Sequence, residues 1–232
     1  MELGEIISDA LTYPLKNIKA LIIYIILGVI LGIAAFTFIV GMSLDNPVAA
    51  IGSGILGFII VLFITFVISG YELDIIKLGI NRDPGSPEID VVRQFINGVK
   101  LFVVDIVYFI IPIIIAAILA LIFQHWLSGI ITFILFIIFA LAAVMATCRL
   151  AKTEDLGFAL AIGDAIGDIS RIGIVKVLLF IIIVPIIVLV LAFIVGFIQQ
   201  LSSVIGGILM GILGVYITFF VARATGLLYS DV

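Results

Sequence analysis

One carboxylate, Asp105, lies inside a segment that is otherwise apolar and long enough to cross a membrane. An ionisable group near the middle of a bilayer costs roughly 2.5–3.5 kcal/mol, which makes Asp105 a candidate for a cation or proton site. Tyr108, one helical turn further along, is placed to donate a hydrogen bond to it. In the structural alternative, which we favour, Asp105 is only about 7.5 Å along the helix from Lys100. At this shallow depth its side chain either extends to the interface or pairs with Lys100, Arg149 or Lys152 at the same membrane face.

Two prolines, Pro112 and Pro185, also fall inside apolar segments. Each removes one backbone hydrogen bond and frees a carbonyl oxygen, which in transporters can line an ion site. Neither proline is accompanied by a paired polar residue, and a kink that fits helix packing is the commoner outcome. We retain both as candidate functional residues, with helix packing as the favoured interpretation.

The sequence lacks the motifs that would establish catalysis. It contains no Gly-rich phosphate loop with a lysine, no HExxH and no CxxC. His125 is the single histidine and a poor metal site by itself, and Cys148 has no histidine partner nearby in sequence. We therefore expect no catalytic, cofactor or metal site. An enzyme acting on lipids within the membrane would have to use Asp105, Tyr108, Asp164 and Asp168.

The elements that carry these residues are predicted membrane spans. The chain has 232 residues, of which 65% are hydrophobic and 11% charged, and a water-soluble core cannot bury so much apolar surface. Its apolar runs are each long enough to span a bilayer with some tilt. They cover about Ile18–Gly41, Val48–Gly70, Leu101–Phe123, Leu127–Cys148, Ile174–Ile198 and Val204–Ala222. Very short links alternate with long ones, so we predict an all-α integral membrane protein with six spans in three hairpins.

The distribution of basic residues predicts the orientation. All 11 Lys and Arg residues lie before the first span, in the two long links or after the last span, and none lies in the three short links. Because cytoplasmic loops retain Lys and Arg, both termini and both long links are predicted to be cytoplasmic.

Each hairpin follows a segment with helical amphipathic periodicity. The segments begin near Leu3, at Ser86-Pro87-Glu88 and at Thr153-Glu154-Asp155. We predict three interfacial helices on the cytoplasmic side of a single membrane domain, residues 1–232. Residues 1–82, 83–153 and 154–232 either form three internal repeats or are simply three similar membrane hairpins, and both interpretations stay open.

Several stretches, in their order and spacing, resemble an archaeal membrane protein family known as domain of unknown function 4013. They are Gly70-Tyr71 to Ile76, Phe95 to Lys100, Tyr108, Pro112, Met145-Ala146, Leu156 to Ala159, Ile169 to Gly173 and Ala222 to Tyr229. The resemblance implies a multi-pass protein of an archaeal, methanogen plasma membrane. It brings no activity, substrate or site residue to carry over.

Three functions follow as hypotheses. The first is a non-catalytic membrane organiser or complex subunit, whose partners are membrane lipids and either another protein or a second copy of the chain, with no nucleic acid. Two stripes of small residues, Gly28-xxx-Gly32 and Gly207-xxx-Gly211, would allow close helix packing within or between chains. The second is a transporter or channel for an ion or a lipid-like cargo, and the third is the lipid enzyme described above.

Overall fold

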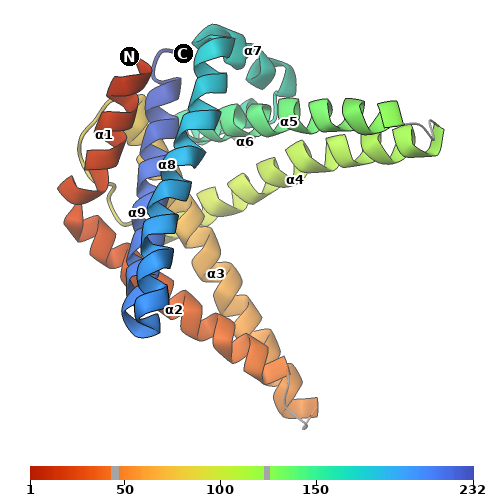
Figure 1. Cartoon of the computed structure of the whole chain (residues 1–232). Coiled ribbons are helices and arrows are strands. Elements are labelled where there is room, and N and C mark those ends of the chain that lie inside the picture. Colours follow the sequence, from red (N-terminus) through yellow and green to blue (C-terminus); the bar gives the residue numbers. More distant parts are fainter. Residues whose placement is uncertain (43–46, 123–125) are drawn as a thin grey trace.

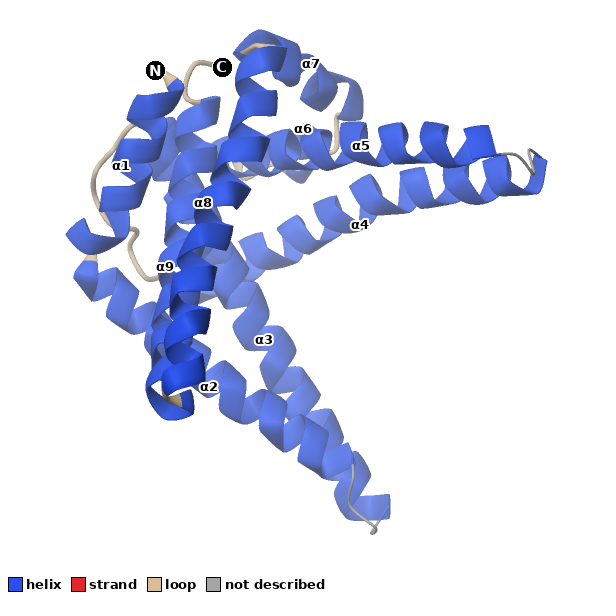
Figure 2. Cartoon of the chain, viewed as in Figure 1, coloured by secondary structure: helices blue, strands red, loops and turns tan. Residues whose placement is uncertain are grey.

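The computed structural model describes residues 1–42, 47–122 and 126–232, and their secondary structure is helical (Figure 1, Figure 2). The described helices are α1 (Leu3–Lys16), α2 (Ile18–Met42), α3 (Pro47–Ile80), α4 (Val91–Ile122), α5 (Trp126–Thr153), α6 (Leu156–Ala159), α7 (Ile162–Ile172), α8 (Ile174–Leu201) and α9 (Ser203–Tyr229). The predicted end of the third span at Phe123, and His125, lie outside the described residues.

Six of the described helices are long and apolar enough to cross a membrane, with mean hydropathies between 1.6 and 3.6. They are α2, α3, α4, α5, α8 and α9, which confirms the predicted number and order of spans. Consecutive spans pack as three hairpins, α2–α3, α4–α5 and α8–α9. Figure 1 shows that the hairpins share one end and diverge away from it, with both chain termini at the shared end.

The buried core lies at this shared end. Its large apolar members include Tyr71, Ile75, Phe219, Phe220 and Leu227. Half of the apolar window of α9 is buried inside the protein, against 11–28% for the other spans, so α9 is the central helix. The remaining apolar side chains of the spans face outward, as is expected where lipid is the solvent.

The second predicted amphipathic helix does not exist as a separate element. Residues 83–90 are not helical, and α4 begins at Val91 and runs unbroken into the span, so the predicted start at Ser86-Pro87-Glu88 is wrong. Asn97-Gly98 lies between Val91 and Leu101 but does not end the helix, because extending an existing helix is easier than starting a new one. α3 likewise continues beyond the predicted end at Gly70 to Ile80.

The first and third amphipathic segments form α1 and α6–α7. As predicted, Asp155 caps the third segment, since its side chain accepts hydrogen bonds from the backbone amides of Gly157 and Phe158. α1 packs against α9 and α7 packs against α5. Ala10 of α1 and Ala165 of α7 are fully buried, so part of each apolar face covers the chain's own helices.

Two glycines allow α3 and α4 to cross closely. A Cβ atom at Gly70 would lie 1.8 Å from the backbone oxygen of Gln94, and one at Gly98 would lie 1.9 Å from that of Phe66. Only glycine avoids both clashes. The stripes singled out in the sequence behave differently, because a Cβ at Gly28 or Gly211 would meet no atom of the described residues within 4 Å.

Candidate functional site

The basic residues gather at the shared end of the hairpins, where α1, α6 and α7 also pack; we call this end the hub. Several of its charged side chains are buried in the described part of the chain, and they link helices that are far apart in sequence. The buried charged residues of the hub are Asp74, Arg149, Asp168 and Arg223.

Arg149 of α5 is held by the α6–α7 segment. Its Nε donates to the carbonyl oxygen of Phe158 at 3.0 Å, and its terminal nitrogens contact Asp168 at 3.0 Å and Asp164 at 3.2 Å. The guanidinium also lies over the Phe158 ring, 3.8 Å from the ring centroid. These hydrogen bonds, ion pairs and the ring contact replace the water that the planar guanidinium loses on burial. They explain why the side chain is almost unexposed without a large energetic cost.

Asp168 completes this cluster from α7. It has no exposed surface, and it accepts from the hydroxyl of Tyr229 at 2.5 Å and from Arg171 at 2.8 Å, in addition to Arg149. The ion pair with Arg149 therefore joins α7 to α5, and the hydrogen bond from Tyr229 joins α7 to α9. Asp164 and Asp168, the pair left to a lipid enzyme, are partners of Arg149 in the structure.

A second cluster surrounds Arg223 near the end of α9. Its Nε donates to Asp9 of α1 at 2.7 Å and its Nη1 donates to the carbonyl oxygen of Asp83 at 2.5 Å. The guanidinium lies 4.8 Å from the centroid of the Tyr13 ring, and the Tyr13 hydroxyl donates to the carbonyl of Gly85. Burial raises the pKa of Tyr13 well above its usual range, so the hydroxyl stays protonated. The cluster fastens α1 and the α3–α4 link to α9.

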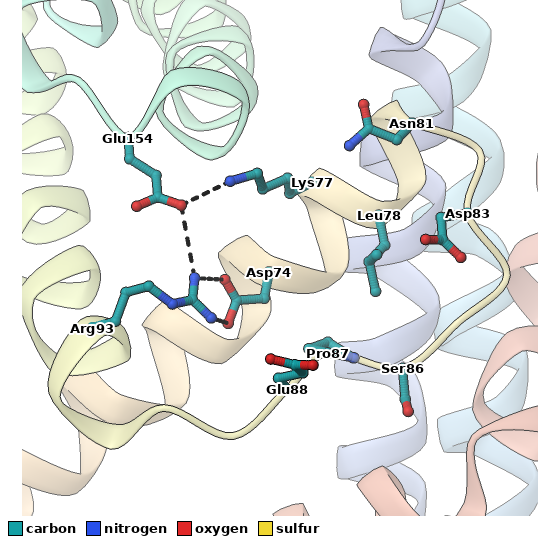
Figure 3. A pocket seen from close by; sticks show the side chains of 10 residues that line it. All are labelled: Asp74, Lys77, Leu78, Asn81, Asp83, Ser86, Pro87, Glu88, Arg93 and Glu154. Carbon is teal, nitrogen blue, oxygen red and sulfur yellow. Dashed lines mark hydrogen bonds and ion pairs between the residues drawn. The ribbon is translucent and has the colours of Figure 1, made fainter.

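A third cluster joins α3 to α4 and lines a polar cavity of about 550 Å³ (Figure 3). Arg93 makes two parallel contacts with Asp74, at 2.6 and 2.9 Å, and Gln94 donates to the same carboxylate at 3.0 Å. On the opposite side, Glu154 accepts from Lys77 at 2.8 Å and lies 3.7 Å from Arg93. The hydrogen bond from Lys77 holds the pKa of Glu154 below its usual value.

The expected partners of Asp105 are engaged elsewhere. Lys100 donates to the carbonyl oxygen of Glu154 at 2.7 Å, Arg149 binds the carboxylates of α7, and the Lys152 ammonium lies over the Tyr229 ring. Within the described residues, the half-buried Asp105 carboxylate makes no hydrogen bond or ion pair. The predicted pairing of Asp105 with these basic residues is therefore wrong, because other elements reach them first.

Tyr108 does not donate to Asp105 either. Its fully buried hydroxyl donates to the carbonyl oxygen of Ala159 in α6 at 2.9 Å. Residues 105 and 108 are adjacent on the helix surface, but Tyr108 points into the core beneath α6 while Asp105 remains half exposed. The structure thus gives Tyr108 a packing role and separates it from Asp105.

The two prolines lie in continuous helices. Pro112 is buried within α4 and Pro185 is exposed on the surface of α8. The structure therefore does not bring Pro112, Pro185 and Asp105 together into one site. The candidate roles of Pro112 and Pro185 stay predictions.

Sequence reasoning missed two carboxylates of α3. Glu72 accepts from the Tyr24 hydroxyl at 2.7 Å, and Asp74 belongs to the third cluster. Both were assigned to a loop because the second span was ended at Gly70. The available signal in the sequence was the absence of Gly and Pro from Tyr71 to Leu78, which lets the helix continue past Gly70.

The charged groups of the hub mainly hold its helices together. Its buried guanidinium groups and carboxylates contact one another, which leaves them poorly placed to bind a reacting group. Among the residues that the structure describes, no group of three or more His, Cys, Asp or Glu residues could hold a metal ion. Cys148 is buried, with its sulfur 3.8 Å from the carbonyl oxygen of Thr225.

Comparison with known proteins gives one match. No curated protein and no solved structure matches the chain. The profile of a family described as "Protein of unknown function (DUF4013)" matches residues 53–199, which run from α3 to α8 and include the Asp74–Arg93 and Arg149–Asp168 ion pairs. The last stretch of the resemblance, Ala222 to Tyr229, lies outside the matched residues. Because the match covers more than half of the chain, this protein belongs to the DUF4013 family.

Proposed function

We propose that this protein is a non-catalytic, multi-pass membrane component that acts as an organiser or as a subunit of a complex. The observation that carries the proposal is that the buried charges form ion pairs between helices. These pairs link α3 to α4, α5 to α7 and α9 to α1. A rigid charged end and long lipid-facing helices suit a scaffold. Enzymes instead keep ionisable groups free to meet a substrate.

We further propose that the hub and both termini lie on the cytoplasmic side of an archaeal plasma membrane. The distribution of Lys and Arg supports the side, since such residues are retained in cytoplasmic loops. The resemblance stated above supports the archaeal membrane. Basic residues of the hub would also meet the anionic headgroups of the inner leaflet.

Single-cysteine labelling tests this orientation. In a Cys148→Ser background, Pro84→Cys in the exposed α3–α4 link is expected to react with a membrane-impermeant maleimide only after permeabilisation. Ser202→Cys, between α8 and α9 at the opposite end, is expected to react in intact cells. The reverse pattern would refute the cytoplasmic assignment.

Native mass spectrometry of the protein extracted from its own membranes tests the scaffold proposal. A stoichiometric protein partner, a second copy or a specifically retained lipid is the expected result. A bare monomer with neither partner nor lipid, from extraction conditions that preserve other complexes, would contradict it.

Transport of a lipid-like cargo is the second candidate function. An apolar cavity of about 400 Å³ lies between α2 and α3, and a hydrophobic cargo needs few polar groups along its path. Reconstitution into liposomes containing a labelled phospholipid would reveal transfer between leaflets. Transfer no faster than in protein-free liposomes would remove this candidate.

A further inference from the structure

Two cavities of different character adjoin at the start of α2. The first, of about 400 Å³, is almost wholly apolar and lies between α2, α3 and the beginning of α4. The second, of about 340 Å³, lies between the start of α2 and the α3–α4 link and is lined by Lys19, Ser86 and Glu88 among others. Tyr71 and two isoleucines, Ile23 and Ile89, line both cavities. Their volumes fall in the usual range of ligand sites, about 300–1,000 Å³.

The hydroxyl of Tyr71 is the unusual group at their junction. Tyr71 is 3% exposed, and its hydroxyl is the one buried side-chain oxygen or nitrogen in the described residues without a hydrogen-bond partner. Its ring is fixed against Tyr24 and Phe219, with centroid distances of 5.6 and 5.9 Å. A buried hydroxyl without a partner costs about 1–3 kcal/mol, and an acceptor brought by a ligand would remove this cost.

Two exposed side chains of opposite charge, Lys19 and Glu88, line the second cavity. Neither the ammonium of Lys19 nor the carboxylate of Glu88 forms an ion pair with a described residue, and they do not pair with each other. The backbone carbonyl of Glu88 is engaged by Gln94, which fixes this part of the link. The second cavity therefore places a cation, an anion and the Tyr71 side chain beside one ligand.

We propose that the two cavities together bind one bilayer phospholipid whose headgroup carries both a phosphate and an amine. A hydrocarbon chain occupies the apolar cavity, the phosphate oxygens accept from Lys19 and Tyr71, and the amine pairs with Glu88. A membrane lipid fits better than a soluble ligand because the apolar cavity is walled by the spans α2 and α3. This inference rests on the proposed organiser role and names the lipid class that the organiser binds.

Native mass spectrometry with defined lipids tests the site. The purified, delipidated full chain is titrated with phosphatidylethanolamine and with phosphatidylglycerol of the same chains. One phosphatidylethanolamine is expected to bind preferentially. Lys19→Met and Tyr71→Phe should each weaken this binding about tenfold, the value of one hydrogen bond to a charged group. Leu27→Trp, at a half-exposed wall position of the apolar cavity, should weaken it by obstructing the chain.

Matched variants separate binding from folding. Lys16→Met removes an exposed lysine one turn earlier that lines neither cavity, and should bind normally. Tyr71→Phe removes a hydroxyl without a partner, so its unfolding midpoint in lipid-free detergent should not fall. Glu88→Gln should reduce the preference for phosphatidylethanolamine over phosphatidylglycerol by about tenfold.

Equal binding of phosphatidylethanolamine by wild type, Lys19→Met and Tyr71→Phe would overturn the site. Equal binding of the two lipids by the wild type would overturn the assignment of the headgroup. If no lipid binds here but a stoichiometric partner copurifies, either another protein or a second copy of the chain, this inference fails and the proposed function stands. If neither is found, both fail.

Discussion

Arg149 is the residue on which the hub depends most directly, because it meets a carboxylate that has no exposed surface. Replacing Arg149 by Met leaves the Asp168 charge buried with less compensation. Breaking a buried ion pair from one side typically costs about 3–5 kcal/mol. We expect Arg149→Met to lower the free energy of unfolding in detergent by that amount, measured by equilibrium denaturation followed by circular dichroism.

Arg171 provides the control for this prediction. It contacts the other oxygen of the same carboxylate, but its side chain is 64% exposed. Exposed ion pairs contribute less than about 1 kcal/mol, so Arg171→Met should be nearly neutral. Equal losses for the two variants would show that burial of Arg149 does not determine its contribution.

Replacing Asp105 is expected to stabilise the protein, whereas replacing Arg149 is expected to destabilise it. Its carboxylate is half buried in α4 and has no partner among the described residues, so its charge opposes insertion without a compensating contact. Asp105→Leu should raise the stability of the detergent-solubilised protein by about 1 kcal/mol, less than the cost at the bilayer centre. The thermal unfolding midpoint measures this, with Asp105→Asn as the polar variant of similar size. A lower midpoint for Asp105→Leu would indicate a partner or a bound cation.

At the scale of the elements, the crossing of α3 and α4 depends on backbone contact at two glycines. A Cβ at Gly98 would overlap the carbonyl of Phe66, and a backbone atom cannot be moved aside by a rotamer change. Gly98→Ala should therefore destabilise the protein by about 1–3 kcal/mol or more through overpacking. The denaturation midpoint is the measurement.

Gly28→Ala serves as the matched control, because nothing lies within 4 Å of a Cβ there. Alanine is also the better helix former by about 1 kcal/mol, so this variant should be neutral or stabilising. Destabilisation by Gly28→Ala would reveal a close neighbour at this position, such as a second copy of the chain.

Two ion pairs have similar positions relative to the proposed repeats. Arg149, near the end of the second hairpin, contacts Asp164 of the following α7, and Arg223, near the end of the third, contacts Asp9 of α1. Between the first and second hairpins the charges are exchanged, since Asp74 belongs to α3 and Arg93 to α4. The division into residues 1–82, 83–153 and 154–232 stays a prediction.

For the whole molecule, the depressed pKa of Glu154 makes stability depend on pH. A carboxylate with a folded-state pKa below its unfolded value stabilises the fold above the unfolded pKa, about 4.3 for Glu. This contribution is lost as the pH falls through the folded pKa. We expect an unfolding midpoint that falls below about pH 4.3 for this reason.

Glu154→Gln removes this titration. The variant should be less stable at neutral pH, because Lys77 loses its partner, and should lose less stability than the wild type on acidification. Midpoints measured from pH 3 to pH 7 for both proteins test this. Parallel curves would show that Glu154 does not contribute to the acid sensitivity.

The sequence by itself determined the six spans, their pairing into hairpins and the side of the chain that collects basic residues. Span length follows from bilayer thickness, and the segregation of charge is readable along the chain, so neither needs knowledge of distant contacts. The Asp155 cap and the amphipathic faces of the segments that form α1 and α6–α7 were also readable, because they depend on residues within a few turns.

Only the tertiary structure decided which polar groups meet. Tyr108 reaches Ala159 rather than Asp105, Arg149 reaches Asp168, and the Tyr71 hydroxyl is left without a partner among the described residues. Such contacts depend on where helices cross and how they are rotated, and these are set by close backbone approaches such as that at Gly98. Residues distant in sequence are brought together by this packing, and for that reason the candidate lipid site could not be found in the sequence alone.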